Sequence, residues 1–388
     1  MTSRYPGRPK PRPFPRAFPG YRTFVAALVA VASAALVGGA AAIEIGSAAP
    51  ANLPANPSAT NQPGANPSIV NPPDANPPGT GPSTAEWRPE IVAAGQPART
   101  AVVLNSESDD LSIIDGPSLA VTKTVLAGRE PHHWMLGPDG RLMIANTRGN
   151  DLLYIDRTSG DVQGRRGGIV NPYLSGFSPD DRWMVVNSLR LGFVGIYRGG
   201  DLTPIARLKT GGMPSHLAFD ADSRKAFVTL QSSDQLVQID LEKQVVDWSI
   251  PVGNTPAGVL LTPDGNHLLV GVMGAADVAV VDWRNARIVK RIPTGRGSHN
   301  LLQVPGKPFI LVSNRGGNTI SVIDLRSFAV IDTLEVPGGP DCMAFSPDNR
   351  QLWVTARWRG QVHVLDLADR RIVKTIPVGR SPHGIFVE

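Results

Sequence analysis

The sequence of 388 residues has a single cysteine, Cys342, which excludes two kinds of stabilisation at once. A disulfide within the chain needs two cysteines, and a zinc cluster built from cysteines also needs more than one. Charged residues are also few, at 18%, against 41% hydrophobic residues, 40 glycines and 36 prolines. This balance favours many short strands and turns over long helices. We therefore expect an all-β fold that is stabilised by packing.

The formal net charge of +5 is concentrated near the N-terminus. Residues 1–97 contain seven Lys and Arg against four Asp and Glu, which leaves 31 against 29 for residues 98–388. Because the remainder is nearly neutral, the charge does not indicate binding to nucleic acid.

Residues 1–43 have the layout of a signal peptide or signal anchor. Six basic residues precede an apolar run from Phe24 to Ile43, and no acidic residue occurs before Glu44. The run is about as long as a membrane span, while the small residues 40–42 offer a cleavage site, so both forms remain open. The basic residues before the apolar run are expected to stay on the cytoplasmic side of the membrane, with everything after Ile43 outside. Either form predicts an exported domain that is periplasmic, on the cell surface or secreted, and residues 24–43 would tether it to the membrane if retained.

The next segment, residues 44–97, is predicted to be a disordered linker. Pro, Asn, Ala and Gly dominate it, and Ala-Asn-Pro recurs at positions 55, 65 and 75. Such a composition cannot bury a core and favours an extended spacer. The spacer is either a passive tether or a segment that a partner recognises.

Beyond residue 98 the sequence repeats with a period of 41 or 42 residues. The period is marked by the turn segments 138–140, 179–181, 221–223, 263–265, 305–307 and 347–349. Each unit contains four short runs of strand-forming residues, as in 300–304, 309–312, 320–323 and 330–334. Four strands in a unit of this length predict a propeller blade.

A second-strand motif occurs seven times, which predicts seven blades. Its copies are Val102–Asn105, Met143–Asn146, Met184–Asn187, Ala226–Thr229, Leu268–Gly271, Ile310–Ser313 and Leu352–Thr355. The first copy lacks a strand before it, and the last five residues, Gly384–Glu388, match a first strand. We therefore predict that residues 98–388 form a seven-bladed β-propeller of four-stranded blades, closed by the C-terminal strand.

These motifs resemble the YVTN-repeat propellers of the YncE type. The resemblance rests on second strands that end in Val-Asn or Val-Thr, third strands that end in Val-Ile-Asp, and Ser-Pro-Asp turns, over residues 99–388. It is specific for the fold and says little about function, because propellers include both binding modules and enzymes. The aspartates that close the third strands are interpreted as turn caps. They are Asp115, Asp156, Asp240, Asp282, Asp324 and Asp366, with Tyr197 as the exception.

Histidines occur in four of the seven loops that enter first strands. They are His132, His133, His216, His299 and His383. The resemblance implies that first strands line a central channel and that these loops share a face with the loops between second and third strands. Ring closure would place His132 beside His383. We expect the other histidines to lie too far from this pair to share an ion.

Arginines occur in both sets of loops, which predicts that one face of the propeller carries most of the histidines and many arginines at the channel mouth. Arg129, Arg296 and Arg380 precede first strands, and Arg148, Arg190, Arg315, Arg357 and Arg359 follow second strands. The acidic residues Glu107, Asp109, Asp110, Glu130 and Asp341 oppose them.

Three interpretations of this face remain open. The side chains can be structural, each bonded to a neighbouring loop; they can form a pocket for an anionic or polar ligand; or they can hold a metal ion or haem. We favour a monomeric, non-enzymatic binding or scaffold domain that engages a small ligand or a protein partner at this mouth. The alternative is a metal- or haem-associated propeller, or a lactonase-like hydrolase, that uses the same face. No nucleophile elbow, phosphate loop or HExxH pattern identifies a reaction.

Overall fold

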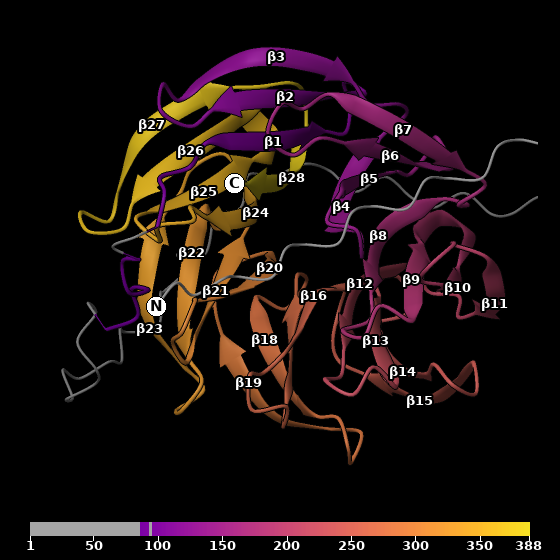
Figure 1. Cartoon of the computed structure of the whole chain (residues 1–388). Coiled ribbons are helices and arrows are strands. Elements are labelled where there is room, and N and C mark those ends of the chain that lie inside the picture. The colour runs from indigo at the N-terminus through magenta and orange to yellow at the C-terminus, as the bar shows by residue number, and fades with distance from the viewer. Residues whose placement is uncertain (1–85, 93–94) are drawn as a thin grey trace, which may run out of the picture. The chain divides into compact units, whose positions relative to one another are not determined.

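The computed structural model describes residues 86–92 and 95–388, which form seven four-stranded antiparallel sheets (Figure 1). The predicted leader and most of the predicted linker lie outside the described residues. Among the residues described, none belongs to a helix long and apolar enough to cross a bilayer. The seven sheets confirm the predicted seven-bladed propeller.

The first blade combines the C-terminal strand with the first three strands of the chain, and the next three blades follow in sequence up to residue 251. The first contains β28 (Pro382–Val387), β1 (Thr100–Asn105), β2 (Asp110–Asp115) and β3 (Ala120–Leu126). The second contains β4 (Pro131–Leu136), β5 (Leu142–Asn146), β6 (Asp151–Ile155) and β7 (Val162–Gly167). The third contains β8 (Pro172–Phe177), β9 (Trp183–Ser188), β10 (Phe193–Arg198) and β11 (Pro204–Lys209). The fourth contains β12 (Pro214–Phe219), β13 (Lys225–Leu230), β14 (Gln235–Asp240) and β15 (Val245–Pro251).

The remaining three blades repeat the same order. The fifth contains β16 (Pro256–Leu261), β17 (Leu268–Val272), β18 (Asp277–Asp282) and β19 (Arg287–Pro293). The sixth contains β20 (Ser298–Gln303), β21 (Phe309–Asn314), β22 (Thr319–Asp324) and β23 (Ala329–Glu335). The seventh contains β24 (Pro340–Phe345), β25 (Gln351–Ala356), β26 (Gln361–Asp366) and β27 (Arg371–Pro377). Short 3₁₀ helices, η1 (Leu189–Leu191) and η2 (Arg357–Arg359), follow the second strands of the third and seventh blades.

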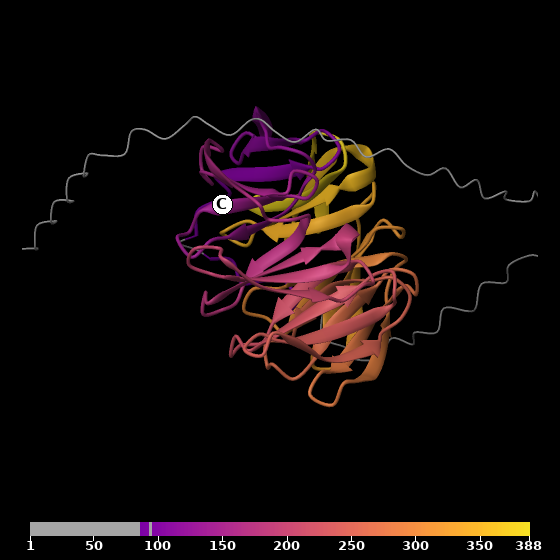
Figure 2. The ribbon, with the colours of Figure 1, turned by 90° about the vertical axis from the view of Figure 1, so that its right-hand side faces the viewer.

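The C-terminal strand closes the ring as predicted. Strand β28 pairs antiparallel with β1, so that Val102 lies opposite Phe386 (Figure 1). The backbone N–H groups of Arg99 and Thr100 both donate to the carbonyl of Glu388, at 2.5 and 3.1 Å. In the view turned by 90°, the indigo strands of the first blade lie against the yellow strands of the seventh (Figure 2). Closure pairs the inner edge of β1, which would otherwise be exposed.

Alternation along the inner strands builds the core between blades. In β1, Val102 and Leu104 pack toward the second blade, while Ala101 and Val103 pack toward the seventh. Successive side chains of a strand point to opposite faces of its sheet, so one strand supplies two separate cores. The aliphatic second and third strands are therefore buried on both faces, while outer strands such as β7 are mostly exposed.

The aspartates that close the third strands are turn caps, as predicted. In each of the six, one carboxylate oxygen accepts a backbone N–H two or three residues later, as Asp366 does from Ala368 and Asp369 at 2.8 and 2.9 Å. This arrangement holds a tight turn between the third and fourth strands. The repeated aspartate is accounted for by folding alone.

Trp87 anchors the end of the predicted linker to the propeller. Its side chain is fully buried among apolar residues of the sixth and seventh blades, including Phe309 and Leu352. Its indole N–H donates to Asp332 Oδ2 at 2.7 Å, and Arg370 also binds this carboxylate. A tryptophan side chain removes a large apolar area from water when it is buried, and its indole N–H then needs a hydrogen-bond acceptor. Part of the segment assigned to the linker therefore packs as a component of the core.

Candidate functional site

The loops that enter the first strands all turn in the same way. The residue directly before each of these strands has a left-handed backbone, with φ between 48° and 76°, at Glu130, Asn171, Met213, Thr255, Gly297, Gly339 and Ser381. A β-bulge follows in each strand, as in β4, where Pro131 pairs with Asn146 but His133 pairs with Ala145. A bulge redirects the side chains beside it. This is why two successive side chains of β4, His132 and His133, both reach the channel.

Side chains of the preceding blade hold four of these turns. Asn318, the residue before β22, accepts the backbone N–H groups of Gly338 and Gly339, both at 3.0 Å. Equivalent bonds run from Glu130 to Asp109, from Asn171 to Asn150 and from Thr255 to Asp234, at 2.8, 2.8 and 2.9 Å. Each bond joins one blade to the turn that precedes the first strand of the next blade. The sequence interpretation missed this role, although these acceptors also follow the repeat.

The second residue of each first strand has the same register position in all seven blades. In chain order these residues are His132, Tyr173, Ser215, Ala257, His299, Asp341 and His383. His133 and His216 come one position later. All five predicted histidines are 0–6% exposed. We call these five side chains the histidine cluster.

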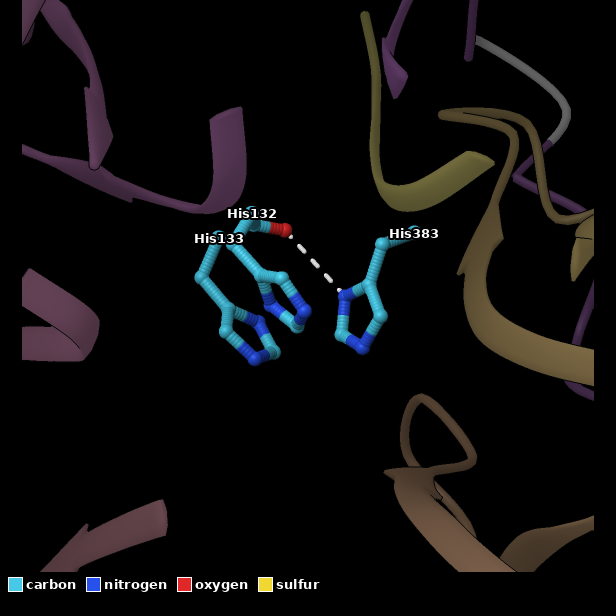
Figure 3. A group of neighbouring side chains, drawn as sticks. All are labelled: His132, His133 and His383. Carbon is cyan, nitrogen blue, oxygen red and sulfur yellow. Dashed lines mark hydrogen bonds between the residues drawn. The ribbon is translucent and has the colours of Figure 1, made fainter. Parts of the chain in front are cut away.

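The histidine rings of the cluster lie close together. The ring centroids of His132 and His383 are 3.7 Å apart, and that of His133 lies 4.5 Å from His383 (Figure 3). One ligand nitrogen from each of these three lies within 4.8 Å of the others. A nitrogen of His383 also lies within 4.8 Å of ligand atoms of His299 and Asp341. The expectation that the other histidines lie too far away to share an ion with His132 and His383 is wrong for His133, which the bulge brings inward. Among the described residues, His299 shares a group with His383 but not with His132, and His216 belongs to neither group.

Asp341 is the charged centre of the channel. Its carboxylate, which is fully buried, contacts Arg315 Nη2 at 2.6 Å and Arg357 Nη1 at 3.2 Å. His299 Nδ1 also lies close to this carboxylate, 2.9 Å from Oδ1. Burial alone would raise the pKa of Asp341, but the charge of Arg315 and the neighbouring histidines outweigh it and hold this pKa well below its usual range. Asp341 is therefore an anion held between two cations.

Burial keeps the cluster uncharged. It lowers the pKa of His133 to about 3 and, with the charge of Arg315, that of His299 to about 4. Burial also holds the pKa values of His132, His216 and His383 well below the usual range. Neutral imidazole keeps one ring nitrogen with a lone pair. All five rings are therefore in the form that binds metals or accepts hydrogen bonds at neutral pH.

A cavity of about 550 Å³ forms the channel mouth. Its lining includes Arg129, Arg148, Arg190, Arg357 and Arg380, together with Glu107, Asp109 and Glu130. Arg148 and Arg190 both pair with Glu130, at 3.1 and 2.6 Å. In the described part of the chain, neither Arg129 nor Arg380 forms an ion pair with a side chain. Five arginines against three carboxylates leave the mouth positively charged.

Two predicted site arginines lie elsewhere. Arg296 is exposed and donates to the carbonyl of Gly316 at 3.1 Å, outside the lining of the mouth. Arg315 is also absent from that lining, because Asp341 holds it in the channel, where its Nη2 lies 3.2 Å from His383 Nε2. The sequence could place both arginines in loops of this face but could not tell which way their side chains turn.

The sequence interpretation did not single out Tyr173 as a site residue. Its ring is 6% exposed and lies 4.2 Å from that of His132, and burial raises its pKa to about 12. Tyr173 follows the loop proline as His132 does, so the repeat register alone could have identified it. Asp341, named only as an opposing acid, has the same register.

The repeated sequence matches a recognised family of propellers. Residues 78–388 match the family described as YNCE-like beta-propeller. The chain belongs to this family. The match covers the whole described propeller and includes the segment that carries Trp87.

Solved structures share the fold of this YNCE-like propeller at low sequence identity. The periplasmic gluconolactonase PpgL of Pseudomonas aeruginosa is 18% identical with a TM-score of 0.62, over 74% of this chain and 98% of that one. Kuenenia stuttgartiensis hydrazine synthase is 21% identical with a TM-score of 0.57, over 66% and 92%. The dihydro-heme d1 dehydrogenase NirN is 18% identical with a TM-score of 0.57, over 76% and 77%. No curated protein matches the chain. At such identities the likeness concerns the fold alone.

Proposed function

We propose that this YNCE-like propeller is an exported binding protein that captures a small anionic ligand at the mouth of its channel. The observation that carries the proposal is the cavity of about 550 Å³ lined by five arginines against three carboxylates. Guanidinium groups bind carboxylates and phosphates through paired hydrogen bonds. Arg129 and Arg380 are the best placed, since no acidic side chain of the described residues neutralises either one.

Export is part of the proposal and is supported by the sequence. The basic residues before position 24 and the apolar run to Ile43 have the order of a secretion signal. A propeller delivered outside the cytoplasm would meet its ligand in the periplasm or the medium. The lactonase-like alternative is supported only by the likeness of fold to the gluconolactonase, so binding without turnover remains the favoured function.

Calorimetric titration with inorganic phosphate and with citrate, on protein stripped of metal with EDTA and then freed of EDTA, tests the mouth. Charged hydrogen bonds contribute about 1.5–3 kcal/mol each, and these arginines are exposed, so Arg129→Ala and Arg380→Ala should each weaken binding about tenfold. Arg296→Ala is the matched control, because Arg296 is an exposed arginine of the same face outside the cavity. The proposal fails if neither anion binds the parent protein, or if Arg296→Ala weakens binding as much as the other two changes.

A further inference from the structure

The histidine cluster leaves several buried nitrogens without a partner. Among the described residues, nothing hydrogen-bonds to Nδ1 of His132 or to Nε2 of His133, His216 and His299. A buried polar atom left unpaired costs about 1–3 kcal/mol. Native structures contain few such atoms. Those of His132 and His133 belong to neighbouring residues and point to a ligand that they share, whereas those of His216 and His299 lie outside this group.

Three of the histidines are arranged around a common point. His132 and His133 extend from β4 and His383 extends from β28, with their rings turned toward one another (Figure 3). Their ligand nitrogens lie within 4.8 Å of one another. Nitrogens bound tetrahedrally to zinc at 2.0–2.1 Å would lie roughly 3.4 Å apart. The ring centroids of His132 and His383 are 3.7 Å apart, closer than two rings that bind one ion in their planes, so these rings would have to rotate and move apart to bind it.

We propose that the channel binds one divalent transition-metal ion through Nδ1 of His132, Nε2 of His133 and Nδ1 of His383. Nδ1 of His383 lies 3.1 Å from the carbonyl of His132 and would exchange this hydrogen bond for the ion. Nε2 of His383 would then carry the proton and donate to Asp341 Oδ2, which lies 3.5 Å away, and would give up the hydrogen bond that it accepts from Arg315 Nη2 at 3.2 Å. A carboxylate that orients a metal-bound histidine in this way is a common second partner in metal sites. Arg315 would keep its contact with the other oxygen, at 2.6 Å.

The second possible group, His299 with Asp341 and His383, is less suitable for a cation. Both oxygens of Asp341 already contact guanidinium groups, those of Arg315 and Arg357. A dication there would lie directly beside two positive charges, which Coulomb repulsion disfavours strongly in a buried site. Asp341 therefore acts as the orienting partner and not as a ligand.

The donor set indicates the class of metal. Neutral imidazole nitrogens suit zinc, copper, nickel and iron, whereas magnesium and calcium prefer oxygen. Three protein nitrogens also leave the fourth tetrahedral position open. Because the three rings bring no negative charge, we expect an anion such as hydroxide or chloride to complete the coordination.

The test uses the full chain without a polyhistidine tag, stripped with EDTA and then given Zn²⁺. Metal retained after gel filtration is measured by elemental analysis, and Co²⁺ is added separately as a spectroscopic probe. The parent protein should retain one equivalent of Zn²⁺, and its Co²⁺ complex should show the intense visible bands of tetrahedral nitrogen coordination. His132→Ala and His133→Ala should each weaken Zn²⁺ binding at least tenfold.

Two other histidine variants separate this site from general binding by imidazole. His216→Ala changes the cluster outside the three ligands, and His363→Ala changes a ring bonded to Thr375 and Pro337; both should bind like the parent. Substoichiometric Zn²⁺ in the parent, or unchanged affinity in His132→Ala, overturns the proposal. If either ligand variant does not fold, the parent's Co²⁺ spectrum decides, since a weak octahedral spectrum also overturns it. Phosphate binding at the mouth is measured on metal-free protein, so each proposal can fail alone.

Discussion

Arg315 holds the carboxylate of Asp341 at 2.6 Å in the channel, although the aspartate side chain has no exposure to solvent. A buried ion pair does not of itself add much stability, but removal of one partner leaves an uncompensated charge and costs about 3–5 kcal/mol. We expect Asp341→Ala to lower the free energy of unfolding by about that amount, because Arg315 and Arg357 both lose their counter-charge. Unfolding in urea measures the change.

The matched control for Asp341 is Asp369→Ala. Asp369 pairs with Arg371 at 3.1 Å, and both side chains are more than half exposed. Exposed ion pairs contribute at most about 1 kcal/mol, so this variant should unfold almost like the parent. Equal losses in the two variants would mean that the burial of Asp341 is not what makes its pairing important.

Trp87 is expected to contribute to stability although it belongs to the segment before the repeats. Replacing a fully buried Trp by Ala costs about 3–5 kcal/mol, and Trp87→Ala also removes the hydrogen bond to Asp332. Thermal unfolding should shift downward, and limited proteolysis should cut the chain before Arg99 more readily. Trp358→Ala is the control, since Trp358 is 62% exposed and should leave both readouts unchanged.

Stability at acid pH should depend on Lys225 and Asp240. Burial alone would raise the pKa of Asp240, but hydrogen bonds from Lys225 and from the backbone of Lys243 outweigh it and lower this pKa to about 2. A lowered pKa stabilises the fold above the ordinary value near 3.8, and the stabilisation is lost as pH falls toward 2. We expect Lys225→Met to cost about 2 kcal/mol at pH 6, with the difference from the parent shrinking below pH 4.

Urea unfolding at several pH values follows that change, and Lys243→Met provides the control. Lys243 reaches the same carboxylate at 3.4 Å, but its side chain is 72% exposed. Solvent screening leaves such a pair with little effect, so this variant should follow the parent at every pH. A Lys225→Met curve that stays parallel to the parent down to pH 3 would contradict the assignment.

The sequence predicted the blade number and the closure because both depend on the repeat. Residues such as Pro382 and Ile385 could be matched to a first strand by register alone, and aspartates such as Asp366 by their place at the strand end. The shared face of the histidines followed from the same register. What the register does not contain is the direction of a long side chain, which is why Arg296 was predicted in the mouth.

Other features depend on contacts that no short sequence pattern records. The bulge after Pro131 turns both His132 and His133 inward, whereas simple alternation would send one of them away from the channel. Trp87 lies in a stretch whose composition indicates a linker, and only its contacts with residues more than 200 positions later explain its burial. Local composition cannot indicate partners at that separation.

The segment around Trp87 also contacts one particular end of the propeller. Glu90 and Val92 contact Lys307, Asp348 and Asn349, which belong to turns between first and second strands. Those turns lie at the opposite ends of the strands from the arginines and histidines of the channel. Residues 86–92 therefore pack at the end of the strands opposite to the channel mouth, where they do not cover its arginines.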